Sequence, residues 1–101
     1  MHVSENLDQN LESSVEMFKA LANPLRLRIL IELMTSSQCV HDLTMVTEAS
    51  QPLVSQHLRV LRQARLVSGQ KAGREIVYSI SDDHIAHIVR DALTHNSEEK
   101  K

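Results

Sequence analysis

The sequence is poor in aromatic residues, cysteine, glycine and proline. Phe18 and Tyr78 are its only aromatic residues, so a core has to be built from aliphatic side chains, as helical packing permits. The single cysteine, Cys39, excludes an intrachain disulfide and fits a reducing compartment. No apolar run has the length of a membrane span, and the acidic start lacks the pattern of a signal peptide. We therefore expect a cytoplasmic protein without membrane contact.

What the sequence does contain is enough for one small domain. With 101 residues, of which 42% are hydrophobic, the chain can fold but has little apolar surface to spare. Dimerisation would relieve that limit. We expect a flexible N-terminal arm over residues 1–10, a folded domain over residues 11–98 and a tail over residues 99–101.

Helical spacing and capping residues predict two helices in the first third of the chain. The first carries apolar residues at helical intervals, namely Leu11, Val15, Phe18 and Leu21. Asn23 followed by Pro24 is typical of an N-cap and a first-turn proline, which starts a second helix. That helix is expected to end near residues 35–38.

Two further helices are predicted before residue 64. A short helix covers about residues 40–47, with Leu43 and Val46 facing inward. Ser50 caps the next helix, which runs to about Gln63 and tolerates a proline in its first turn. The buried stripe expected for this helix is Leu53, Val54, Leu58 and Leu61.

From Leu66 the apolar period changes from helical to alternating, which predicts a β-hairpin with a turn at residues 71–74. Ser81 and Asp82 then cap a last helix. Four helices, a hairpin and a final helix form the arrangement of a winged helix-turn-helix. The predicted fold is therefore mainly α, with a β-hairpin wing and a C-terminal dimerisation helix.

The charges are distributed unevenly along the chain. The net charge is −2, yet every formal charge between Ala49 and Arg74 is positive: Arg59, Arg62, Arg65, Lys71 and Arg74. The acidic residues cluster near the two ends of the sequence. Such asymmetry is typical of a local phosphate-binding face on an otherwise acidic protein.

The fourth helix and the hairpin tip carry the side chains that DNA recognition needs. Glutamine pairs with adenine, serine with either partner, and arginine with guanine or phosphate. The predicted DNA-binding residues are Ser50, Gln51, Ser55, Gln56, Arg59, Arg62, Lys71 and Arg74. The alternative is that a solvated helix simply needs polar residues. His57 is interpreted as structural, packed beneath the helix.

The last twenty residues contain a pattern of metal-ligating residues. Asp82, His84, His95 and Glu98 are the predicted ligands. On a helix, His84 and His95 differ by a rotation of about 20° and lie on one stripe, but roughly 16 Å apart along the axis. A single zinc ion bonds its ligands at about 2.0–2.2 Å, so one helix cannot close the site. A second, antiparallel copy would complete two four-ligand sites, which predicts a metal and a homodimer together.

Two other interpretations of the same residues stay open at this point. Asp82 is a good N-cap, and exposed histidine and glutamate are ordinary on a surface helix. Alternatively, His84, His87 and Asp91 are spaced for a weaker site within one chain.

Three segments resemble the ArsR/SmtB family of metal-sensing bacterial repressors. They read FKALANPLRLRIL (residues 18–30), SQPLVSQHLRVLR (residues 50–62) and GREIVYSI (residues 73–80). The resemblance extends over about residues 15–98. It implies a last helix at the dimer interface, with Asp82, His84, His95 and Glu98 at the ligand positions of the zinc-sensing members. It also implies that a ligand histidine, here His95, relays metal binding to the DNA-binding core.

The resemblance further implies a second metal site at the start of the third helix. Cys39 and Asp42 lie where its helix ligands would be. The N-terminal arm, which supplies the remaining ligands in the family, offers only His2 and no cysteine. This second site is therefore expected to be weak or absent, and the alternative is a buried free cysteine at a helix start.

These inferences together predict a homodimeric repressor that binds operator DNA without metal and is released or weakened by Zn(II). Two imidazoles and two carboxylates suit Zn(II) or Co(II), with Ni(II) ranked next. One alternative is a winged-helix regulator that responds to another metal or to a non-metal signal. A zinc hydrolase is disfavoured because four protein ligands leave no position for water. A dimerising adaptor without DNA contact is the remaining alternative. The sequence thus predicts a protein that is not an enzyme.

Overall fold

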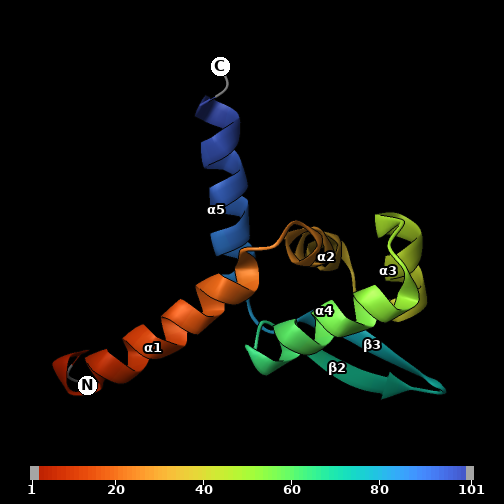
Figure 1. Ribbon diagram of the computed structural model, residues 1–101, viewed down its shortest axis with the longest axis horizontal. Helices are drawn as coiled ribbons and strands as arrows, with labels where there is room; N and C mark the ends of the chain where they lie inside the picture. Colours follow the sequence, from red (N-terminus) through yellow and green to blue (C-terminus); the bar gives the residue numbers. More distant parts are fainter. Residues whose placement is uncertain (1–2, 100–101) are drawn as a thin grey trace.

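Within the described residues, five helices and a hairpin follow one another in the predicted order, with one additional short strand before the third helix (Figure 1). A computed structural model describes residues 3–99, so the ends of the predicted arm and tail, residues 1–2 and 100–101, lie outside the described residues. The elements are α1 (Val3–Leu21), α2 (Pro24–Thr35), β1 (Gln38–Cys39), α3 (Val40–Thr47), α4 (Gln51–Gln63), β2 (Val67–Ala72), β3 (Glu75–Ile80) and α5 (Asp83–Glu99). The mainly α fold with a hairpin wing is confirmed.

The first helix is longer than predicted and exposes its apolar stripe. α1 begins at Val3, so residues 3–10, expected as a flexible arm, are helical, because no glycine or proline interrupts the segment. The predicted apolar stripe continues back to Leu7, and four of its members are between 43% and 56% exposed: Leu7, Leu11, Val15 and Phe18. Among residues 6–21, the buried side chains lie at the end of the helix, at Ala20 and Leu21. α1 therefore shows an unpaired apolar face to solvent.

The predicted caps are present. The side chain of Asn23 accepts a hydrogen bond from the backbone N–H of Arg26 at 3.0 Å, and Pro24 occupies the first position of α2. Ser50 caps α4 in the same way, accepting from the N–H of Leu53 at 3.4 Å. These contacts set the starting points of the two helices that form most of the core.

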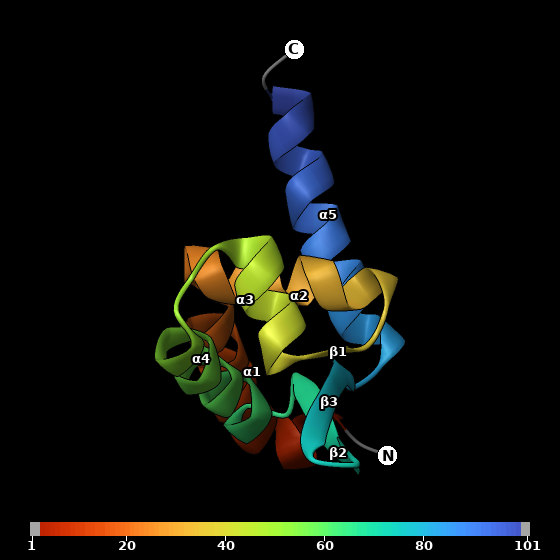
Figure 2. The same ribbon diagram turned by 90° about the vertical axis from the view of Figure 1, so that its right-hand side faces the viewer.

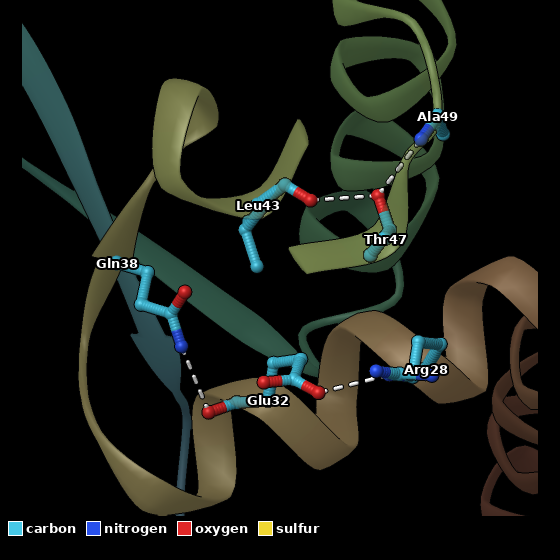
Figure 3. A network of polar contacts seen from close by, with 6 residues as sticks. All are labelled: Arg28, Glu32, Gln38, Leu43, Thr47 and Ala49. Atoms are coloured by element: carbon cyan, nitrogen blue, oxygen red, sulfur yellow. Dashed lines mark hydrogen bonds and ion pairs between the residues drawn. The ribbon is translucent and has the colours of Figure 1, made fainter. Parts of the chain in front are cut away.

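Side-chain hydrogen bonds to the backbone shape the connections around α3 (Figure 3). The Thr47 hydroxyl donates to the carbonyl O of Leu43 at 2.6 Å and accepts from the N–H of Ala49 at 3.3 Å. Glu48, between α3 and α4, has a φ of 61°, the left-handed conformation that often ends a helix. On the other side, Gln38 donates from Nε2 to the carbonyl O of Glu32 at 3.1 Å, which ties β1 to α2.

The strands form an antiparallel sheet in the order β1-β3-β2, and β1 was not predicted. β2 and β3 pair from Val67 opposite Ile80 to Ala72 opposite Glu75. The turn is therefore Gly73 and Arg74 alone, shorter than the four residues predicted, and Gly73 has the positive φ of 66° that so tight a connection needs. The hairpin is the wing of the fold.

The core is aliphatic and contains no buried polar or charged residue among those described. Its largest fully buried side chains are Ile29, Leu30, Leu43, Val54, Leu58, Leu61, Leu66 and Val89. Two residues predicted to face inward do not, because Val46 is 40% and Leu53 41% exposed. Both lie at the edge of the apolar stripe of a short helix, where the core ends.

Only the first half of α5 belongs to this core. Ile85 and Val89 are buried, whereas every side chain from Arg90 to Glu98 is exposed, Leu93 included. The helix accordingly projects from the body of the protein (Figures 1 and 2). Within residues 3–99 no helix combines the length and apolarity needed to cross a bilayer.

Truncation of the core should cost far more than truncation of the surface of the same helix. Leu43 is fully buried in α3, and Leu43→Ala should lower the free energy of unfolding by about 2–5 kcal/mol through lost apolar contact and a cavity. The matched control is Met45→Ala, also in α3 but 68% exposed, which should change it by less than about 0.5 kcal/mol. Urea titration of both variants measures the difference. Similar losses would show that α3 is not packed as described.

Candidate nucleic-acid interface and metal-ligand residues

One face of α4 presents polar and basic side chains to solvent. Because Val54, Leu58 and Leu61 turn the opposite face into the core, the exposed positions fall together on the outer side of the helix. The exposed residues that the sequence predicted for DNA are Gln51, Ser55, Gln56, Arg59 and Arg62. Ser50 is exposed as well, but its hydroxyl caps the helix. The helix thus offers amide, hydroxyl and guanidinium groups in a row, without an acidic side chain between them.

The wing and the end of α4 enclose a basic hollow. An open hollow of about 450 Å³ is lined by Arg62 from α4 and by Lys71 and Arg74 from the wing. Gly69, Glu75 and Ile76 complete its lining, so one carboxylate accompanies three cations. Residues far apart in sequence are therefore brought together by the fold into a surface suited to phosphate groups.

His57 lies on the side of α4 that faces α1 and α2, as predicted for a structural residue. It is half-buried, and its Nδ1 lies 3.1 Å from Nη1 of Arg26. Burial, and secondarily the charge of Arg26, lower the pKa of His57 below its ordinary value. The contact with Arg26 was not predicted, because nothing in the spacing of residues 26 and 57 indicates it.

Asp82 and His84 form one half of the predicted metal site. The carboxylate Oδ1 of Asp82 accepts hydrogen bonds from the backbone N–H of His84 at 2.9 Å and of Ile85 at 3.3 Å, so it caps α5. The same oxygen lies 3.4 Å from Nδ1 of His84. Two ligands of one tetrahedral zinc ion are separated by roughly 3.3 Å, so these two side chains fit a shared ion.

His95 and Glu98 lie near the other end of the same unbroken helix. One chain does not bring them to Asp82 and His84, as the spacing predicted. Nor are His84, His87 and Asp91 gathered into a site, since residues 3–99 contain no group of three His, Cys, Asp or Glu side chains able to hold a metal. A complete site on α5 requires ligands from a second chain.

The second predicted site has its two helix residues side by side. Cys39 is buried at the start of α3, and Asp42 lies in the first turn. A hydrogen bond from the backbone of Asp42 favours a lower pKa for the Cys39 thiol. Burial and the Asp42 and Glu75 carboxylates outweigh it, so the pKa is raised. His2, the only ligand expected from the arm, lies outside the described residues. The described part of this site favours a protonated thiol.

Comparison with known proteins identifies the relatives of this chain. Residues 23–68 match the family model "Bacterial regulatory protein, arsR family". The chain is 45% identical over 89 residues to the HTH-type transcriptional repressor SmtB of Mycobacterium tuberculosis, covering 88% of this chain and 66% of that protein. It thus spans just under two thirds of that relative's length. It is 42% identical over 94 residues to the transcriptional regulator NmtR of the same species, covering 92% of this chain and 78% of NmtR.

A solved structure supports the fold. The homodimeric winged helix-turn-helix DNA-binding domain Mb0332 of Mycobacterium bovis, a possible ArsR-family regulator, superimposes with a TM-score of 0.87 at 24% identity. The match covers 93% of this chain and 87% of that one. The winged helix-turn-helix architecture is therefore confirmed.

Replacements of Asp82 should separate its capping role from its charge. Asp82→Ala removes the acceptor for two backbone N–H groups and should lower the free energy of unfolding by about 1 kcal/mol. Asp82→Asn keeps an oxygen that can cap the helix and should be close to neutral. Thermal unfolding of the metal-free protein measures both. Equal destabilisation by the two variants would contradict the capping geometry.

Proposed function

Because the chain belongs to the ArsR family of bacterial regulatory proteins, we propose that it is a homodimeric transcriptional repressor that releases operator DNA when Zn(II) binds. The main support is that the fold places two kinds of functional group on different elements. Base- and phosphate-binding groups lie on α4 and the wing, and metal-ligating groups lie on α5. Membership in a family of regulators argues against the hydrolase interpretation. A regulator of bacterial DNA acts in the cytoplasm, where the chromosome is.

DNA binding uses α4 as the recognition helix. Its exposed glutamine, serine and arginine side chains match the donors and acceptors of the major groove. Arg62, Lys71 and Arg74 in the basic hollow then neutralise backbone phosphates beside it. In a dimer, two such helices need to lie about 34 Å apart to enter successive major grooves.

The homodimer is supported by what one chain leaves exposed. The apolar stripe of α1 and Leu93 of α5 expose large apolar side chains to solvent. Covering them with a second chain would stabilise the protein. The side chains of residues 90–98 of α5 are exposed in one chain, so this part of the helix can pack against a second α5. Antiparallel pairing of two α5 helices places Asp82 and His84 of one protomer beside His95 and Glu98 of its partner.

The regulatory ligand in this proposal is Zn(II), with Co(II) and Ni(II) as the next candidates. Two imidazoles and two carboxylates are the proposed donors, and Asp82 and His84 already lie at the separation of two zinc ligands. When bound, zinc supplies a bridge that fixes the two α5 helices relative to each other.

Repression and metal response are then linked thermodynamically. If ligation by the α5 residues weakens operator binding by a given factor, operator binding weakens ligation by the same factor. The SmtB of Mycobacterium tuberculosis is a transcriptional repressor by name, which favours repression over activation as the role of this chain. The second candidate is a winged-helix regulator that responds to a non-metal signal. It stays open because the described residues of one chain do not form a complete metal site by themselves.

DNA binding should depend on salt in proportion to the phosphates neutralised. Lys71→Ala and Arg74→Ala should each weaken duplex binding and reduce the slope of log affinity against log salt by about 1. The control is Arg28→Ala, which removes an exposed cation on α2 outside the hollow and should leave the slope unchanged. Fluorescence anisotropy with the DNA upstream of its own gene measures the slopes. Equal slopes in all variants would show that the wing does not contact the DNA.

Zinc titration should show two ions per dimer. His84→Ala and His95→Ala should each abolish zinc-dependent release of the duplex, whereas His41→Ala, an exposed histidine on α3, should not. Zinc binding should weaken on acidification, because imidazole must be neutral to ligate. Calorimetry and the anisotropy assay measure both quantities. One ion per dimer, or unaltered release in either α5 variant, would contradict the shared site.

A further inference from the structure

The side chain of Arg26 joins three helices at the corner between α1 and α2. From the first turn of α2, its Nε donates to the carbonyl O of Ala20 at 2.6 Å and its Nη2 to that of Lys19 at 3.3 Å. Both carbonyls belong to the last turn of α1, and that of Lys19 also accepts from the backbone N–H of Ala22 at 3.2 Å. Its Nη1 lies 3.1 Å from Nδ1 of His57 in α4. One planar guanidinium therefore links the end of α1 to the recognition helix.

The chemistry of this link fixes the state of His57. Arginine has N–H donors and no acceptor, so Nδ1 of His57 has to accept the hydrogen bond with its lone pair. The ring is then neutral and carries its proton on Nε2. A protonated ring would have a donor at Nδ1, and it would place a second positive charge 3.1 Å from the guanidinium.

The position of His57 makes this contact relevant to DNA. His57 directly follows Gln56 and lies two residues before Arg59, both on the exposed face of α4. A rotation of α4 about its axis that breaks the contact also turns those two side chains. At the other end of the link, α1 carries the exposed apolar stripe assigned above to the dimer. The Arg26–His57 contact thus connects the dimer face to the base-reading face.

We propose that Arg26 and His57 are positioning residues for operator binding, which hold α4 at a fixed orientation relative to α1. This inference rests on the proposed function, because it assigns the contact a role in DNA affinity. His57 itself is not required to touch DNA. Operator affinity should depend on the hydrogen-bond acceptor at Nδ1.

Acidification should open the contact. The charged or titratable side chains on elements packed against α4 include Glu16, Lys19, Arg26, His41, Asp42 and Lys71. Among the described groups, only the guanidinium of Arg26 acts on the pKa of His57, and it lowers that pKa in addition to the larger effect of burial. The contact is therefore fully formed above the ordinary histidine value of 6.5 and is lost as the pH falls through the lowered pKa.

The test compares two replacements of His57 in the full-length, metal-free protein. His57→Leu removes the acceptor, whereas the Oδ1 of His57→Asn occupies nearly the position of Nδ1, accepts from Arg26 and does not titrate. Anisotropy with the same upstream duplex, in the presence of a chelator, should show that His57→Leu binds roughly tenfold more weakly or worse. His57→Asn should bind nearly as tightly as the wild type. The double variant Arg26→Leu/His57→Leu should be no weaker than Arg26→Leu alone.

The dependence on pH distinguishes this role from a merely structural one. As the pH falls below the ordinary histidine value of 6.5, the wild type should lose affinity relative to His57→Asn. Protonation of other groups has the opposite effect on affinity, because a more positive protein binds DNA more tightly. His41→Asn, the same replacement at an exposed position, should follow the wild type.

Three outcomes would overturn the inference: wild-type affinity in His57→Leu, equal weakening in a folded His57→Asn, or parallel pH profiles for the wild type and His57→Asn. Thermal unfolding of each variant shows whether it is folded. If His57→Leu is unfolded, the comparison of the wild type with His57→Asn decides. If the wild type itself fails to bind the duplex at low salt, the proposed function fails and this inference with it. If the wild type binds the duplex and the His57 variants bind it equally well, this inference fails but the proposed function stands.

Discussion

Close packing of aliphatic side chains around α2 is the interaction on which the other features depend. α2 contributes Ile29, Leu30 and Leu33, and α3, α4 and the start of α5 pack against them. Each fully buried leucine or isoleucine contributes about 1.5–3 kcal/mol relative to exposure. Since the described core contains no polar or charged residue, all hydrogen-bonding chemistry is displaced to its surface. The core therefore acts as a rigid support for the groups that surround it.

The same shortage of apolar surface explains why a single chain is incomplete. Half of α5 and nearly all of the stripe on α1 lie outside the core that one chain builds. A chain of this size cannot cover both helices, and aqueous exposure of so many large side chains on adjoining helices is typical of an interface. The proposed metal ligands show the same incompleteness, because Asp82 and His84 meet in one chain while His95 and Glu98 lie at the far end of α5. Stability and ligation thus call for the same second copy.

Local features of the fold followed from sequence, and long-range ones did not. Asn23 with Pro24, Ser50 and Asp82 mark helix starts because a cap is a contact between residues three or fewer positions apart. Helical periodicity located the apolar stripe of α1 but could not tell whether the stripe packs into the core or is exposed. Helices that face a core and helices that face a partner have the same apolar period. β1 was missed because two residues of strand carry no periodicity, and only pairing with Tyr78 and Val77 defines it.

The candidate site also has features that were predictable from sequence and features that were not. The spacing of the α5 residues predicted that one helix cannot bring Asp82 and His84 to His95 and Glu98, because helix geometry fixes their separation. The exposed polar face of α4 was also predictable from its period. The gathering of Arg62 with Lys71 and Arg74, however, depends on how the wing folds back toward α4. The contact between Arg26 and His57 likewise joins residues 31 positions apart and has no local signal.

α2 is also the element that relates the two surfaces within one chain. It contacts α5 and α4, and its first turn carries the arginine that holds α1 and α4 together. In the proposed repressor, a displacement of α5 on pairing or ligation would reach α4 through two packed interfaces, without a continuous chain of polar groups. Packed aliphatic interfaces transmit strain because they leave little free volume. The buried face of α2 is accordingly where the proposed metal response and the proposed DNA binding would be mechanically joined.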